Sequence, residues 1–368
     1  MDIQLIPTAD PIPLPAPFWL FKLLLIVTFI LHILVMNFML GGGVLAAIAK
    51  FKSRKNENYR RLFEDLSKKI PSLLAATITL GVAPLLFLQV LYGQFFYSSS
   101  ALIGWPWFLV LIFLTLAYYG FYLIAFKKGA TTSKIGWVML LSVLLIFVVG
   151  FFYSNNMTLL LTPEQWAAKY HADPSGWNLN WGEQTLIPRF LHFFIASIAV
   201  GGLFIASAGL FRWKQDTEYA RFLIKFGGRW FMYVTMLQIA AGLWFLISLP
   251  RAKMMLFMGD NMVATVALLV GIIGALAAIF FMSDTLRKDD PRKGFYLVSG
   301  LTMGVLIFMA IMRDALRDAY LANYFNANNF VVQTQWDVLI LFLALFVGGI
   351  ALWLVMIKRY FFSPKAAS

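Results

Sequence analysis

The chain of 368 residues contains no cysteine, which excludes disulfide bonds, cysteine-ligated clusters and a haem attached through thioether bonds. Charged residues are also scarce, at 13% of the chain against about 25% in a typical soluble domain. Hydrophobic side chains are in excess, at 61% of all residues. This composition indicates an integral membrane protein and argues against a soluble domain with a single anchor.

Apolar runs long enough to cross about 30 Å of hydrocarbon as helices recur along the whole sequence. They predict an all-α integral membrane protein in which residues 1–368 form a single polytopic domain. The predicted transmembrane helices number nine, at residues 18–49, 71–97, 102–126, 135–154, 187–211, 229–249, 261–283, 294–313 and 335–357.

The net charge of +13 is unevenly distributed along the chain. If the N-terminus lies outside, the inner loops and the C-terminus hold 23 of the 30 Lys and Arg residues, eight of them between residues 50 and 69. The positive-inside rule therefore predicts the N-terminus outside and the C-terminus inside. We interpret the basic excess as this topology signal together with contact to anionic membrane lipids, and we expect no nucleic-acid partner.

Two segments each place an isolated histidine in an apolar stretch: "FILHILVMNFMLGG" at 29–42 and "RFLHFFIASIAVGG" at 189–202. In both, Leu-His is followed by eight residues and then Gly-Gly. The match predicts an internal repeat of four spans, with halves at 18–154 and 187–313 and an additional ninth helix at 335–357.

The two repeated histidines, His32 and His192, are each followed twenty residues later by a basic residue at the inner boundary. At about 1.5 Å per residue, both imidazoles lie about 30 Å from the inner charges, in the outer half of the bilayer. A lone histidine there is most simply a neutral imidazole hydrogen-bonded to a neighbouring helix. Ionisable residues inside a span are rare and usually functional, so the repeated pair favours axial ligation of haem. A proton relay would need carboxylates deep in a span, and there are none.

Other residues of these segments have expected structural roles. Gly41 and Gly201 fall half a turn round the helix from the histidines and are predicted to allow close helix packing on the opposite face. The third histidine, His171, lies in a polar outer loop, where a solvated surface residue is expected.

Two outer loops are expected to be long, at residues 155–186 and 314–334. The first contains Thr-Pro-Glu at 162–164, which is typical of a helix start, so a short helix on the outer surface is predicted there. The second follows the eighth span, where an i, i+4 charged ladder is predicted from Arg313, Asp314, Arg317 and Asp318.

At the two histidines the sequence resembles subunit I of the cytochrome bd quinol oxidases. "RFLHFFIASIAVGGLFI" is similar to the family segment that carries the low-spin haem b histidine. "LGVAPLLFLQVLYGQFFYSSS" is similar to the second span of the family, and "SNNMTLLLTPE" to the end of its fourth span. The resemblance covers about the first 250 residues. It implies nine spans with the N-terminus outside, haem-ligating histidines on the first and fifth spans, and a location in the bacterial inner membrane.

The chain departs from this family at the oxygen-reducing site. Family members carry a glutamate at the position of Gln89 and two glutamates on the third span, where this chain has "GWPWFLVLIFLTLAYYG". The Gly-Arg-Gln-Pro-Trp motif is absent, and the quinol-binding loop is shortened to "LPRAKMMLFMGDNM". The resemblance therefore implies a relative that keeps the haem positions but has lost the oxidase chemistry.

The resemblance also suggests further ligands, each with a simpler alternative. The sixth ligand of the low-spin haem in the family is a methionine on span seven, which points to Met262, although methionine is also a common apolar filler. Arg189 is placed to pair with a haem propionate or to snorkel to the interface. The shortened loop offers polar groups for a quinone head, which are alternatively ordinary interfacial charges: Arg251, Lys253 and Asp260.

These observations favour a haem b-containing membrane subunit of a respiratory complex that transfers electrons between the quinone pool and an outer-face redox partner. The expected partners are other membrane subunits, membrane lipids and an outer-face protein such as a c-type cytochrome. Three alternatives remain: a cytochrome bd-type quinol:oxygen oxidoreductase subunit, a haem-free membrane anchor and a secondary transporter.

Overall fold

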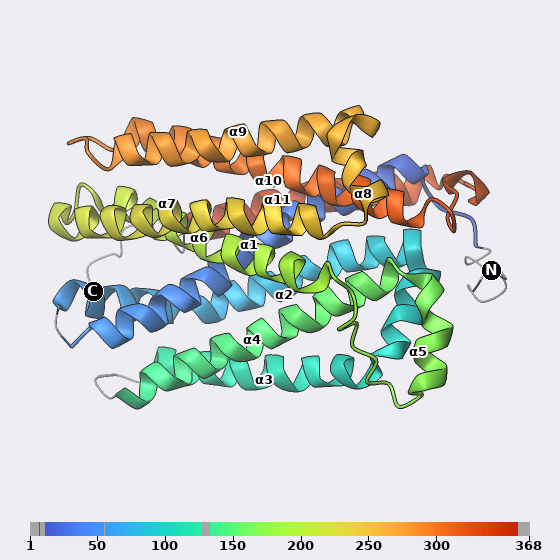
Figure 1. The fold of residues 1–368 in the computed structure, drawn as a ribbon. Helices are drawn as coiled ribbons and strands as arrows, with labels where there is room; N and C mark the ends of the chain where they lie inside the picture. Colours follow the sequence, from blue (N-terminus) through green and yellow to red (C-terminus); the bar gives the residue numbers. More distant parts are fainter. Residues whose placement is uncertain (1–6, 8–11, 55, 127–132, 360–368) are drawn as a thin grey trace.

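The protein is described by a computed structural model at residues 7, 12–54, 56–126 and 133–359, and the described part is helical almost throughout. Nine of its helices are long and apolar enough to cross a membrane, which confirms the predicted number of spans (Figure 1). They are α1 Phe18–Lys52, α2 Glu57–Leu102, α3 Gly104–Phe126, α4 Ser133–Leu160, α6 Leu186–Arg212, α7 Thr217–Ser248, α9 Met262–Thr285, α10 Arg292–Leu321 and α11 Trp336–Ile357.

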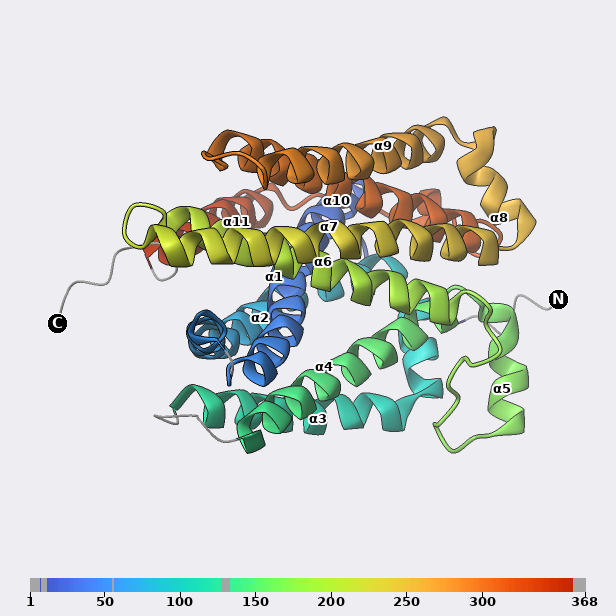
Figure 2. The same ribbon diagram turned by 60° about the vertical axis from the view of Figure 1, so that its left-hand side comes forward.

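Short helical segments lie between the long ones. The 3₁₀ turn Pro163–Gln165 leads into α5, Trp166–Ala172, which confirms the short helix predicted in this loop. The turn between α7 and α9 contains α8, Arg251–Met255, and the π-helical turn Leu256–Asp260. Helices α5 and α8 lie at the same end of the bundle, called here the α5 end (Figures 1 and 2).

Several helices are longer than predicted. α4 continues to Leu160 and α10 to Leu321, so the predicted loops at 155–186 and 314–334 both begin too early. α2 and α7 begin well before their predicted spans, where the side chains of Asn56 and Asp216 accept hydrogen bonds from the first helical turns. Hydropathy marks only the part of a helix that lies in hydrocarbon, whereas backbone hydrogen bonds continue through polar turns beyond it.

The long helices pack as neighbouring pairs around a central contact between α1 and α6. The most extensive pairings are α6 with α7, α1 with α2, and α9 with α10, followed by α1 with α6 and α3 with α4. Helices α3 and α4 lie on one side of the bundle and α9 on the opposite side (Figures 1 and 2). The paired arrangement is what a four-helix repeat would produce, and the repeat itself remains a prediction.

Glycines bring the two central helices together. A Cβ atom placed on Gly41 of α1 would lie 1.8 Å from the backbone oxygen of Ser197 on α6. A Cβ on Gly201 of α6 would lie 2.6 Å from the carbonyl carbon of Gly41. The close packing predicted for these two glycines is confirmed, because any side chain at either position would push the helices apart.

The ninth helix, α11, lies on the periphery of the bundle. None of the residues in its most apolar 18-residue window is buried. Only one side touches other helices, for example through Phe342, whose ring lies 6.2 Å from that of Phe87 on α2. The remaining apolar surface is suited to contact with lipid or with another membrane subunit.

Candidate functional site

His32 lies on α1 and faces α2. Its Nδ1 atom is 3.0 Å from the backbone oxygen of Thr77. A carbonyl oxygen can only accept a hydrogen bond, so Nδ1 carries the proton and Nε2 keeps a free lone pair. A Cβ atom on Gly81 would lie 2.9 Å from His32 Cε1, so α2 leaves room for the ring only because residue 81 is a glycine. The ring is held in one orientation with one nitrogen available as a ligand.

His192 lies on α6 and faces α7 in the same way. The side-chain nitrogen of Gln238 is 3.0 Å from Nδ1 and 3.1 Å from Nε2 of the ring. The side-chain oxygen of Gln238 is buried and has no hydrogen-bond partner among the described residues. A Cβ atom on Gly242 would lie 2.9 Å from His192 Cε1. Buried amide oxygens in folded proteins nearly always accept a hydrogen bond, so the free oxygen of Gln238 is an exception that needs an explanation.

The contacts of the two histidines correspond position by position. The histidines are 160 residues apart, and their ring-facing glycines, Gly81 and Gly242, are 161 apart. Their hydrogen-bonding residues, Thr77 and Gln238, are also 161 apart. The contact residues on α2 and α7 were not identified from the sequence, because nothing in either helix marks them as neighbours of a histidine.

Arg189 lies one helical turn from His192, toward the α5 end. Its side chain is nearly enclosed, with 9% of the residue exposed, and its guanidinium carbon is 5.0 Å from the centre of the Phe245 ring. The Nε atom is buried without a hydrogen-bond partner, and no carboxylate among the described residues forms an ion pair with Arg189. A buried guanidinium in this state is suited to receive a carboxylate from a bound group.

An ion network joins α1, α2 and α10 near the α5 end. Lys22 Nζ lies 3.1 Å from an oxygen of Asp314 and also pairs with Asp318. Arg317 pairs with Asp314 three residues before it, and the Tyr92 hydroxyl donates to Asp318 at 3.2 Å. The predicted i, i+4 ladder is therefore wrong, because the two aspartates bond to Lys22 of another helix and to an i, i+3 arginine.

The other predicted ligands do not converge with the histidines in the described structure. Met262 is the first residue of α9 and is 75% exposed, while Arg251 and Asp260 are also exposed. Lys253 donates to the backbone oxygen of Ala319 on α10 at 2.5 Å. The roles of these residues as haem ligand or quinone-binding groups remain predictions.

The third histidine lies apart from this site, and no cluster of metal-binding side chains is found among the described residues. His171 is exposed on α5, as expected for a surface residue. Within the described residues, no three His, Asp or Glu side chains gather in a way that could hold a metal ion.

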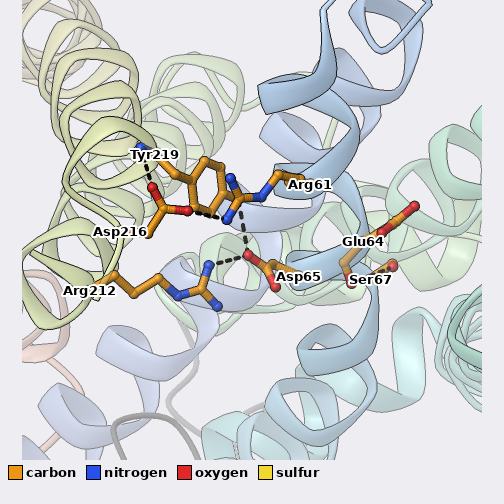
Figure 3. A network of polar contacts seen from close by, with 7 residues as sticks. All are labelled: Arg61, Glu64, Asp65, Ser67, Arg212, Asp216 and Tyr219. Atoms are coloured by element: carbon orange, nitrogen blue, oxygen red, sulfur yellow. Dashed lines mark hydrogen bonds and ion pairs between the residues drawn. The ribbon is translucent and has the colours of Figure 1, made fainter. Parts of the chain in front are cut away.

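A second polar network lies at the opposite end of the bundle and joins α2 to the junction of α6 and α7 (Figure 3). Arg61 donates to Asp216 at 2.5 Å, and the Arg61 guanidinium lies 3.9 Å from the Tyr219 ring centre. Asp65 accepts from Arg212 and, at 2.9 Å, from the Tyr219 hydroxyl. The adjoining cavity, with room for about one water molecule at about 20 Å³, is too small for a substrate. This network is interpreted as structural.

The comparison with solved structures agrees with this architecture. No family model and no curated protein matches the sequence. Among solved structures, the bd oxidase from Geobacillus thermodenitrificans matches with a TM-score of 0.72 at 12% identity, covering 95% of this chain and 100% of the other. The protein therefore has a cytochrome bd oxidase-like fold and is a multi-pass membrane protein.

Proposed function

We propose that the protein is a haem b-containing membrane subunit of a respiratory complex in the bacterial inner membrane, exchanging electrons between the quinone pool and an outer-face redox partner. The observation that carries this function is the matched pair of histidine sites. Each ring lies against a glycine of the next helix and contacts one residue of that helix through its nitrogens, and Arg189, one turn from the second ring, forms no ion pair with a described carboxylate. The bd oxidase-like fold supports the respiratory assignment.

The residues present fit haem directly at His32, whereas at His192 the Gln238 amide lies within 3.1 Å of both ring nitrogens and has to turn away from one of them before that nitrogen can bind iron. The hydrogen bond from His32 Nδ1 to Thr77 leaves Nε2 free to bind iron, and such a bond also raises the basicity of a ligating imidazole. Gln238 fixes the His192 ring, and Arg189 neutralises a carboxylate one turn away. When bound, haem b supplies reversible one-electron chemistry. The chain itself orients both rings and keeps them in an apolar environment.

The acceptor of the electrons is proposed to be another protein. The cytochrome bd family that this chain resembles has a glutamate at the position of Gln89 and two on the third span, whereas α3 here contains no acidic residue, which argues against oxygen reduction. A c-type cytochrome at the outer face is the proposed partner, together with other membrane subunits. Quinone is proposed to bind near α8, through Arg251, Lys253 and Asp260.

A reduced-minus-oxidised spectrum of the purified protein tests this function. A haem b band that weakens in His32→Ala and again in His192→Ala supports it, whereas His171→Ala serves as the matched control because His171 is exposed on α5. A protein without pigment, after expression with haem supplied, would favour the haem-free anchor or the transporter. Oxygen consumption with quinol as donor would instead favour the bd-type oxidase.

A further inference from the structure

Arg313 on α10 has a guanidinium without an acidic partner. Its charged group lies 4.4 Å from the centre of the Phe29 ring on α1. No described carboxylate forms an ion pair with it, even though Asp314 is its neighbour in sequence. Asp314 does not pair with Arg313 because both of its carboxylate oxygens are already used, one by Lys22 and the other by Arg317.

The position of Phe29 relates Arg313 to the histidine sites. Phe29 lies three residues before His32, as Arg189 lies three residues before His192, and the two positions are 160 residues apart. At the second site the guanidinium belongs to α6 itself. At the first site the equivalent residue of α1 is a phenylalanine whose ring face holds the guanidinium of Arg313. Each histidine therefore has an arginine side chain one turn nearer the α5 end.

The surrounding charges make an additional anion favourable here. Arg313 lies beside Phe29, one turn from His32 on α1, and Arg317 follows Arg313 by four residues on α10, so a second guanidinium lies one turn away. Like charges in an apolar environment repel strongly, and an aromatic ring compensates a cation only in part. Arg189 and Arg313 each lack an ion pair with a described carboxylate and each lie one turn from a histidine, so an added negative charge would be stabilised beside the histidines.

We propose that Arg313 binds a propionate carboxylate of the haem held by His32, as Arg189 does for the haem held by His192. This inference rests on the proposed function and adds to it a second carboxylate-binding residue, contributed by α10 across the helix interface. Phe29 acts as the platform that positions Arg313. The same guanidinium chemistry also suits a lipid phosphate, and the experiment distinguishes the two.

Haem release from single-site proteins tests the inference. In His192→Ala, where only the His32 site remains, Arg313→Ala or Arg313→Gln should speed transfer of haem to apomyoglobin about tenfold, as expected for losing a hydrogen bond to a charged group. The midpoint potential of that haem should fall, because removing a nearby positive charge favours the oxidised form. In His32→Ala, the same Arg313 substitutions should change release by less than about twofold. The exposed Arg287→Ala is the matched surface control.

A relocated arginine provides the sharpest test. Phe29→Arg combined with Arg313→Ala puts the guanidinium where α6 carries Arg189, and it should restore slow haem release. Release and potential unchanged by both Arg313 substitutions in folded protein would overturn the inference. Loss of co-purifying phospholipid with haem release unchanged would also overturn it and assign Arg313 to a lipid phosphate. Absence of haem from the parent protein would instead refute the proposed function itself.

Discussion

Gly41 and Gly201, 160 residues apart in the chain, meet backbone to backbone where α1 crosses α6. A Cβ atom on Gly201 would lie 2.8 Å from the Cα atom of Gly41. Each glycine follows its histidine by nine residues on the opposite side of the helix. The contact therefore sets the spacing of the two helices that carry His32 and His192.

Enlarging either central glycine should destabilise the protein. Gly41→Leu forces a side chain into the backbone of α6, and overpacking of this kind costs about 1–3 kcal/mol or more. The measurement is the melting temperature in detergent, followed by size-exclusion chromatography. Gly42→Ala is the matched control, because nothing lies within 4 Å of a Cβ atom there. Equal melting temperatures for the two variants would contradict the close contact.

Replacing a glycine that faces one histidine should disturb haem binding at that histidine and not at the other. Gly81→Ala places a methyl group 2.9 Å from the His32 ring and should displace it, while leaving the His192 site intact. Gly242→Ala should do the reverse. Low-temperature spectra of the two variants would show different haem signals weakened. Gly304→Ala, which has open space at its Cβ, should change neither signal.

The Lys22 ion network should contribute to stability at the α5 end. Lys22→Met leaves Asp314 and Asp318 without their shared cation, and about 1–3 kcal/mol of stability should be lost because Asp314 is mostly enclosed. Lys288→Met breaks an exposed i, i+4 pair and should cost at most about 0.5 kcal/mol. Thermal unfolding of both variants in the same detergent gives the comparison. A larger loss in Lys288→Met would show that enclosure is not the deciding factor.

The contact between Arg61 and Asp216 should make stability depend on acid pH. The hydrogen bond from Arg61 holds the pKa of the Asp216 carboxyl below its usual value. A lowered pKa stabilises the fold above the unfolded value of about 3.9, and this contribution is lost as pH falls through the folded pKa. Asp216→Asn should therefore be less stable than the parent at neutral pH, with the difference shrinking in acid. Asp289→Asn is the surface control, and a difference that grows in acid would refute the assignment.

Part of the site followed from the sequence and part did not. His32 and His192 were recognised from the sequence, because an ionisable residue in an apolar helix is a local pattern. Gly41 and Gly201 were recognised because each follows its histidine at the same spacing. Gln238 and Thr77 were missed, since nothing within α7 or α2 marks them as neighbours of an imidazole. The ladder on α10 was predicted wrongly, because local spacing took no account of Lys22 from α1.

The amino-acid sequence by itself determined the number of membrane helices and the two histidine positions, because hydrophobicity over about twenty residues decides whether a helix can lie in lipid. Only the tertiary structure decided which distant side chains meet those histidines. Arg313 reaches the ring of Phe29, and Asp314 turns instead to Lys22, because helix packing fixes which side chains share one small volume. Such pairings depend on the crossing of whole helices, and no segment of sequence contains that information alone.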